Sequence, residues 1–223
     1  MLPTFGIIAE GVTDQVVLRN ILFGYFNDYD LIIKILQPVD DTTDSSQMST
    51  FGGWYNVFLY CKSDYLEVAL QKNDFIIIQI DSDCSNEKHF DVPKIDGEKV
   101  EFFVERIRKR FQSVISESNG REEYDRIAER IIFAISVNSI ECWLLPLVYN
   151  DKTQGATDNC LFKLNKKLPD GSKINPSKKD KRIYQKISKD FIKTKTLQKA
   201  FPQNPSLKIF VESLENKFEL SRK

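Results

Sequence analysis

Short apolar runs and longer amphipathic stretches alternate along the first two-thirds of the chain. Runs rich in β-branched residues predict buried strands at residues 5–9, 31–36, 75–80 and 131–137. Apolar residues at helical spacing predict a helix after Thr13, helices over residues 54–69 and 100–114, and a helix start within 138–145. Because strands and helices alternate, the pattern predicts an α/β fold with a mostly parallel sheet and helices on both faces.

The composition changes near residue 150, where the strand signals nearly vanish and helical patterns continue around 183–200 and 205–218. Residues 160–200 contain 13 Lys and Arg against three Asp, a formal charge of +10, so the rest of this chain of zero net charge carries −10. We therefore expect a core over residues 1–150. A basic, mostly helical C-terminal extension over residues 151–223 is expected to pack on it.

Two groups of carboxylates follow predicted strands. Glu10 and Asp14 come after the first strand, and Asp81 and Asp83 come after the strand at 75–80. In open α/β sheets, ligands bind in the crevice beyond the carboxyl ends of the strands. Carboxylates gathered there repel one another unless a cation or a proton intervenes. The placement therefore predicts a site for one or two divalent ions, and oxygen ligands favour Mg²⁺ or Mn²⁺.

Each of these carboxylates also has an ordinary explanation. Asp commonly ends a strand, and Asp14 suits the positive first turn of a helix that Thr13 can cap. Asp81 and Asp83 reach one site only if the chain turns at Asp81, because alternate strand residues otherwise point to opposite faces. Glu141 follows the fourth predicted strand at a helix start, where a carboxylate is also favoured. Their joint position at successive strand ends is what favours the metal site.

Few residues are available for other chemistry. The four cysteines form no Cys-x-x-Cys pair and His89 is the only histidine, so a zinc finger or ribbon is not expected. His89 lies in a polar stretch that predicts a surface loop, and no Gly-x-Ser-x-Gly motif occurs. The cysteine contexts favour a reduced, cytoplasmic protein. The N-terminus does not resemble a signal peptide, and no apolar run approaches the roughly 20 residues of a membrane helix.

Three short motifs together resemble a TOPRIM domain: Glu10-Gly11-x-Thr13-Asp14, Asp81-x-Asp83 and Ser139-Ile140-Glu141-x-Trp143-Leu144-Leu145. The resemblance covers residues 1–150 and is greatest to the overcoming-lysogenisation-defect (OLD) nucleases. It extends to the small TOPRIM-like proteins that accompany ABC-type ATPases in bacterial anti-phage systems. It implies a Rossmann-like core with Glu10, Asp14, Asp81, Asp83 and Glu141 as metal-associated carboxylates, and Glu10 as general base or acid. The sequence contains no ATPase P-loop, so a partner chain would supply any ATP hydrolysis.

The basic extension is the predicted surface for contact with nucleic-acid phosphates. The predicted binding residues are its clustered cations, Lys163, Lys166, Lys167, Lys173, Lys178, Lys179, Lys181 and Arg182. One of Lys178, Lys179 or Lys181 could also stabilise charge that develops on a phosphate in the transition state. Two alternatives stay open: the lysines are simply solvated, or the segment docks on the acidic portion of a second copy in a homodimer.

Three functions compete at this stage. The first is a Mg²⁺- or Mn²⁺-dependent nuclease that cleaves DNA or RNA. The second is a binding or regulatory subunit of an ATPase partner, with little activity alone. The third is a phosphatase of the haloacid-dehalogenase type, but there the Asp-x-Asp pair belongs to the first strand, whereas Asp81 and Asp83 follow a later one. A Rossmann oxidoreductase is disfavoured because no Gly-x-Gly-x-x-Gly turn is present.

Overall fold

The computed structural model of this chain describes residues 2–39 and 52–219. The sequence also predicts a polar loop over residues 38–53, and most of it lies outside the described residues. The chain forms two compact units, each built from two stretches of sequence. The first unit comprises Met1–Val12 and Leu31–Ile135, and the second comprises Thr13–Asp30 and Ser136–Lys223. The predicted boundary at residue 150 falls inside the second unit.

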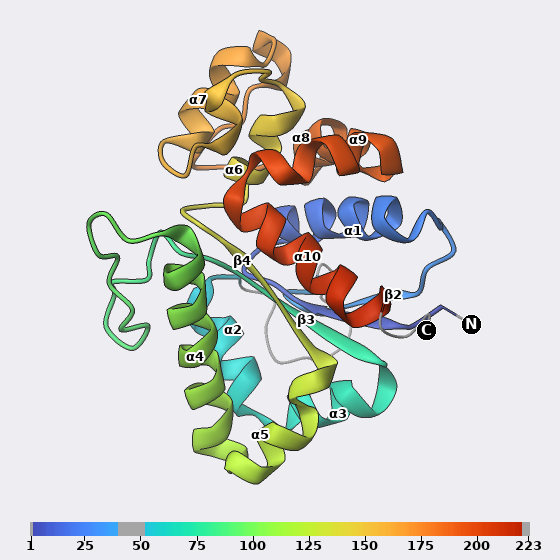
Figure 1. The fold of residues 1–223 in the computed structure, drawn as a ribbon, viewed down its shortest axis with the longest axis vertical. Helices are drawn as coiled ribbons and strands as arrows, with labels where there is room; N and C mark the ends of the chain where they lie inside the picture. Colours follow the sequence, from blue (N-terminus) through green and yellow to red (C-terminus); the bar gives the residue numbers. More distant parts are fainter. Residues whose placement is uncertain (1, 40–51, 220–223) are drawn as a thin grey trace. The chain divides into compact units, whose positions relative to one another are not determined.

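A four-stranded parallel sheet forms the centre of the first unit (Figure 1). Its strands are β1 (Phe5–Ile8), β2 (Ile33–Gln37), β3 (Phe75–Asp81) and β4 (Ile131–Ser136), in the order β2-β1-β3-β4. The predicted α/β class, with helices packed around a parallel sheet and further C-terminal helices, is confirmed. Every residue of β3 after Phe75 is buried, so both faces of this strand are covered.

The helices of the first unit are α2 (Trp54–Lys62), α3 (Asp64–Lys72), α4 (Val100–Asn119) and α5 (Arg121–Ile127). The predicted helix over 54–69 is in fact two helices, because Ser63 between them has an extended backbone. The Ser63 hydroxyl donates to the carbonyl of Tyr60, 2.8 Å away, which satisfies one of the last carbonyls of α2. An aromatic cluster joins α2 to α4, where the ring of Phe58 meets that of Phe111 edge-on.

The second unit is helical, as predicted for the C-terminal part. Its helices are α1 (Val12–Phe26), α6 (Glu141–Leu144), α7 (Cys160–Lys167), α8 (Lys181–Ser188), α9 (Thr194–Ala200) and α10 (Pro205–Glu219). Short 3₁₀ turns connect them: η2 (Leu145–Leu147), η3 (Lys152–Gly155), η4 (Asp170–Ser172), η5 (Lys189–Ile192) and η6 (Phe201–Gln203). None of the described helices is long and apolar enough to span a bilayer.

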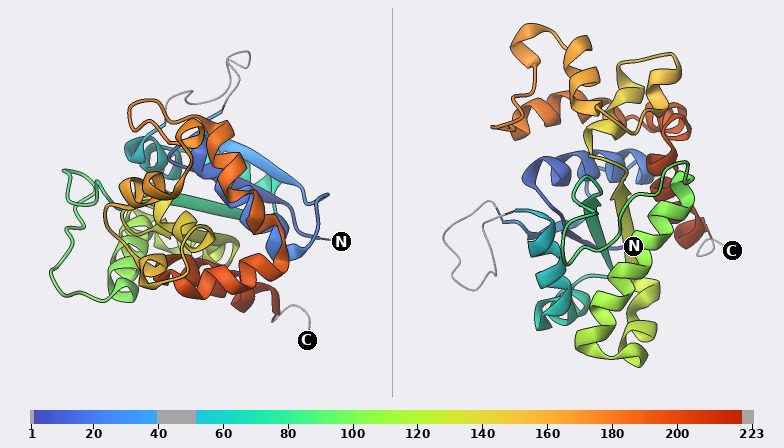
Figure 2. Two further views of the ribbon diagram at one scale, coloured as in Figure 1. Left: turned by 90° about the horizontal axis from the view of Figure 1, so that it is seen from above. Right: turned by 90° about the vertical axis from the view of Figure 1, so that its left-hand side faces the viewer.

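Helix α1 packs closely against the segment from α8 to α9, although over 150 residues of sequence separate them (Figure 2). The Asn20 amide donates to the hydroxyl of Ser188, 2.7 Å away. The Thr194 hydroxyl donates to the carbonyl of Gly24 at the same distance. A Cβ at Gly24 would overlap the carbonyl oxygen of Phe191, so this approach requires glycine.

The prediction that the cysteines are reduced is wrong for one pair. The structure joins Cys142 and Cys160 in a disulfide, with Cα atoms 4.9 Å apart. The pairing arises because α6 and α7 pack together at a distance that a disulfide can bridge. A search for closely spaced cysteines misses it, since 18 residues of sequence separate the two. Cys61 and Cys84 are free thiols.

The glycine contact gives a direct test of the packing in the second unit. Gly24→Ala should lower the free energy of unfolding by about 2 kcal/mol, because overpacking against a backbone carbonyl outweighs the better helix propensity of alanine. The control is Gly171→Ala, where no atom lies within 4 Å of the added Cβ and the change should stay within about 0.5 kcal/mol. Equal effects of the two substitutions in urea denaturation would contradict the close approach.

Candidate functional site

Glu10 and Asp81 come together at the carboxyl ends of two neighbouring strands. Strands β1 and β3 are parallel partners, with Ile8 opposite Ile78. Asp81 is the last residue of β3, and Glu10 follows the end of β1 by two residues. The backbone N–H of Asp81 donates to a carboxylate oxygen of Glu10, 3.2 Å away. The Glu10 carboxylate therefore lies against the backbone of Asp81, and we call these two residues the Glu10–Asp81 pair.

Gln79 holds the Glu10–Asp81 pair together. Its amide oxygen accepts from the backbone N–H of Glu10 at 3.0 Å, and its amide nitrogen donates to a carboxylate oxygen of Asp81 at 3.0 Å. The Gln79 side chain is fully buried. The prediction from sequence missed this residue, although a polar side chain inside the apolar run Phe75–Asp81 is itself a signal. Each carboxylate therefore has one oxygen oriented by an N–H donor.

A pair of glycines approaches the backbone of Glu10. The N–H of Gly53 donates to the carbonyl of Glu10 at 2.8 Å. A Cβ at Gly52 would overlap that same carbonyl oxygen, so only glycine fits. Gly53 also precedes the first residue of α2 and has a positive φ of 107°. The start of α2 is thereby fixed beside the Glu10–Asp81 pair.

Three other residues of the first unit do not join this pair. Asp83 is exposed, two residues after β3. No hydrogen bond or ion pair within the described residues links it to Glu10 or Asp81. His89 lies in an exposed loop, as predicted. Burial, together with the Asp83 and Glu87 carboxylates, raises the pKa of Cys84 to about 12, so this thiol is a poor nucleophile near neutral pH.

Asp14 lies in the first turn of α1, as predicted, and is buried in the second unit. Thr13 does not cap the helix, because α1 already begins at Val12. The Thr13 hydroxyl instead donates to the Asp14 carboxylate at 3.3 Å. Burial, followed by the negative charge of Glu141, raises the pKa of Asp14 from 3.8 to about 7, while the Lys179 ammonium acts in the opposite direction.

Glu141, the first residue of α6, is buried with its own counter-charge. The Lys179 ammonium lies 2.8 Å from a Glu141 carboxylate oxygen, and the Tyr184 hydroxyl donates to that same oxygen. Burial disfavours the charged form. The Lys179 charge and hydrogen bonds from Lys179, Ser139 and Tyr184 outweigh it and lower the pKa of Glu141. Asp14 and Glu141 thus form a second pair, the Asp14–Glu141 pair, in which Lys179 neutralises one member.

The described residues contain no group of three or more Asp, Glu, His or Cys side chains arranged to hold a metal ion. Mg²⁺ commonly takes only one or two protein carboxylates and completes its octahedron with water and phosphate oxygens. The two acids of the Glu10–Asp81 pair fit that pattern, because hydrogen-bond donors already orient their carboxylates. Glu141 fits it less well, since a bound ion would have to displace the Lys179 ammonium.

Several of the predicted phosphate-binding residues have local acidic partners. Lys163 pairs with Asp158, Lys173 with Asp170, Lys179 with Glu141 and Arg182 with Asp180. The Lys167 ammonium lies 5.0 Å from the centre of the Tyr149 ring. Exposed ion pairs contribute little to stability and can exchange a carboxylate for a phosphate, so Lys163, Lys173 and Arg182 stay candidates for nucleic-acid contact, whereas the Glu141 partner of Lys179 is buried.

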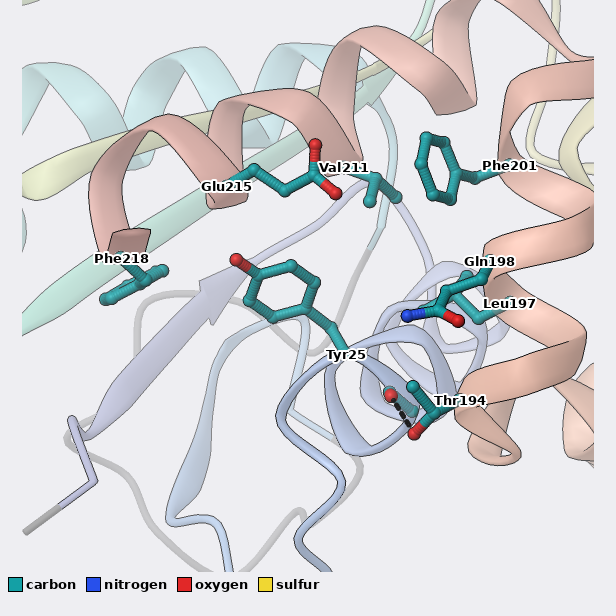
Figure 3. Close-up of a pocket in the computed structure, with 9 residues that line it drawn as sticks. Tyr25, Thr194, Leu197, Gln198, Phe201, Val211, Glu215 and Phe218 are labelled. Carbon is teal, nitrogen blue, oxygen red and sulfur yellow. Dashed lines mark hydrogen bonds between the residues drawn. The ribbon is translucent and has the colours of Figure 1, made fainter. Parts of the chain in front are cut away.

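A small cavity of about 170 Å³ lies between α1, α9 and α10 (Figure 3). Leu197, Phe201 and Val211 form its apolar part, and Tyr25 and Glu215 also line it (Figure 3). Among the described residues that line it, Glu215 is the only charged one.

The buried ion pair of Glu141 can be tested by stability. Lys179→Met should lower the free energy of unfolding by about 1–3 kcal/mol, because it leaves the Glu141 charge buried without its cation. The range is below that of a fully buried pair since the Lys179 side chain is 37% exposed. In a double-mutant cycle with Glu141→Gln, the effects should be non-additive by about 1 kcal/mol. Additive effects, or an equal loss in the neighbouring exposed Lys178→Met control, would contradict the pair.

The raised pKa of Asp14 predicts a pH-dependent cost. The folded state favours the protonated carboxyl, so its stabilising contribution is complete below pH 3.8 and is lost as the pH rises through about 7. Asp14→Asn should therefore stabilise the protein increasingly over that window, by at most about 1.4 kcal/mol for each pH unit. Urea denaturation of both proteins across the window measures this. A difference that stays constant with pH would contradict the burial of an ionisable Asp14.

Comparison of the chain with protein-family models, with curated protein sequences and with solved structures finds no match in any of the three. The structure by itself supports an α/β fold with a four-stranded parallel sheet. Any assignment finer than this fold class therefore depends on the arrangement of the site residues, above all on the Glu10–Asp81 pair.

Proposed function

We propose that this chain is a metal-dependent nuclease of the TOPRIM type that hydrolyses phosphodiester bonds in DNA or RNA. The observation that carries the proposal is the Glu10–Asp81 pair, hydrogen-bonded at the carboxyl ends of adjacent parallel strands. This is where α/β sheets bind ligands. The order of the motifs around Glu10, Asp81 and Glu141 agrees with the TOPRIM resemblance.

Glu10 and Asp81 would be the protein ligands of a Mg²⁺ or Mn²⁺ ion. Such an ion, when bound, polarises the phosphoryl oxygens and lowers the pKa of bound water. Gln79 would keep the Asp81 carboxylate oriented toward it, and the backbone N–H of Asp81 would do the same for the Glu10 carboxylate. Glu10 is also the candidate base that accepts the proton of the attacking water.

Asp14 and Glu141 take a different part in this proposal. The resemblance assigns both to the metal, but Lys179 already neutralises Glu141. Glu141 would then act as a positioning residue that orders the partly exposed Lys179. Lys179 is one of the three lysines predicted to stabilise a transition-state phosphate, and the buried Glu141 carboxylate is its anchor.

One observation favours a second candidate, a regulatory subunit with little activity of its own. A carboxylate that the TOPRIM pattern assigns to the metal is instead paired with a cation of the protein itself. A partner that draws Lys179 away would release Glu141. The resemblance supplies the context for this reading, namely an ABC-type ATPase partner in bacterial anti-phage defence, in the cytoplasm.

Substitution of the two proposed ligands tests the nuclease. Asp81→Asn and Glu10→Gln keep the size and one acceptor oxygen of each side chain but remove the charge that a divalent ion needs. Each should reduce Mg²⁺-dependent cleavage of plasmid DNA, single-stranded DNA or transfer RNA by at least about 100-fold while the melting temperature changes little. The matched control is Asp96→Asn, which removes an exposed carboxylate of the same unit and should leave cleavage unchanged.

Two outcomes would overturn the nuclease proposal. Full cleavage by Asp81→Asn would exclude the Glu10–Asp81 pair as the metal site. Hydrolysis of a small phosphate ester such as p-nitrophenyl phosphate, with no cleavage of any polynucleotide, would favour the phosphatase alternative.

A further inference from the structure

A cavity in the second unit has a volume of about 720 Å³ and shares no lining residue with either carboxylate pair. One side of it is formed by η2 and the residues that follow, and the other by η5, α9 and η6. Its volume lies within the roughly 300–1,000 Å³ of small-molecule sites. We call this cavity the α9 basin.

Two lysines give the α9 basin a positive side. Lys195 and Lys199 both line it and lie four residues apart on α9, hence on one face of the helix. Neither makes a hydrogen bond or an ion pair with any residue of the described chain. Two like charges at this spacing repel each other slightly, and a bound anion would relieve the repulsion. This distinguishes them from Lys163 and Lys173, which already have acidic partners.

One carboxylate also lines the basin, and its charge is already compensated. The Asp190 carboxylate lies 2.7 Å from the ammonium of Lys193, three residues along the chain. Among the described residues, the charged groups that line the basin are therefore one paired acid and two lysines that pair with none of these residues. The basin consequently favours an anion.

The opposite side of the basin is apolar and aromatic. Pro146, Leu147 and Tyr149 line it. The Tyr149 hydroxyl donates to the carbonyl of Lys163 at 2.9 Å, and the Lys167 ammonium lies against the ring, so the tyrosine is held in place. A flat apolar group next to a phosphate would find contacts on both sides of such a cavity.

We propose that the α9 basin binds one nucleotide unit of a single-stranded nucleic acid. Lys195 and Lys199 would contact its phosphate, and the base would lie on Pro146, Leu147 and Tyr149. The inference rests on the proposed function only in that it identifies the polymer on which the nuclease acts. It adds a substrate subsite formed by Lys195 and Lys199, which lie outside the binding residues predicted from sequence between 163 and 182.

Binding in the absence of metal tests the basin separately from cleavage. A fluorescein-labelled oligothymidylate is titrated with the full chain in EDTA, and its affinity is measured between about 50 and 200 mM salt. Lys195→Gln with Lys199→Gln should weaken binding about tenfold or more at the lowest salt. The slope of log affinity against log salt should fall by about 0.7, the value for one lost phosphate contact on a single strand.

The control removes the same charge elsewhere. Lys94→Gln with Lys109→Gln, both exposed in the first unit, should change the affinity by less than about twofold. An equal loss in the two double variants would show that only net charge matters and would overturn the basin. Gln203→Trp, which fills the basin from an exposed lining position without changing charge, should also weaken binding. Unchanged binding in that variant would likewise overturn it.

Competition distinguishes a nucleotide from a simple anion. AMP should displace the labelled oligonucleotide at a concentration at least about tenfold below that of inorganic phosphate, because the base adds contacts of its own. Equal competition by AMP and phosphate would contradict the base-binding side.

Cleavage with unaltered binding in the Lys195→Gln, Lys199→Gln variant would contradict this inference and leave the nuclease proposal intact. Binding that depends on Lys195 and Lys199, without any cleavage, would contradict the nuclease proposal and leave this inference intact.

Discussion

The amide of Gln79 is the constraint on which the Glu10–Asp81 pair depends. Parallel strands that end together bring their following residues to one edge of a sheet, but strand pairing alone does not orient side chains. Gln79 accepts from the backbone of Glu10 and donates to the carboxylate of Asp81, so one buried side chain connects β1 to β3 beyond their last ladder contacts. A buried amide with both ends satisfied costs little and specifies one geometry. A buried core residue thus fixes the positions of two acidic residues at the edge of the sheet.

Charge is handled differently in the second unit. In that unit, the burial of two charged carboxylates would destabilise the folded state, and the chain compensates for this in two ways. Glu141 keeps its charge because Lys179, Tyr184 and Ser139 compensate it. Asp14 instead tends to hold a proton, since burial and the nearby Glu141 disfavour a second negative charge. One pair of acids is therefore oriented by neutral donors and the other is neutralised, a difference that favours Glu10 and Asp81 as the proposed metal ligands.

Local patterns predicted most of the fold. The ends of β1, β3 and β4 fall within about two residues of the predicted positions because burial imposes a strong period on short strands. The break at Ser63 was missed because helical spacing of apolar residues continues across it. Contacts between distant segments were also missed, including the disulfide of Cys142 with Cys160 and the need for glycine at positions 24 and 52. Such contacts depend on which parts of the folded chain pack together, and a short stretch of sequence does not contain that information. The same holds for Lys195 and Lys199, whose importance comes from the cavity they line.

The central claim is that Glu10 and Asp81 bind a divalent cation, and anomalous scattering from crystals soaked in Mn²⁺ tests it most directly. The account predicts an anomalous peak about 2.0–2.3 Å from a carboxylate oxygen of both residues, with Gln79 still bonded to Asp81. The peak should be absent from Asp81→Asn crystals grown and soaked in the same way. A wild-type crystal with no peak there, or with manganese bound only at other residues, would contradict the account.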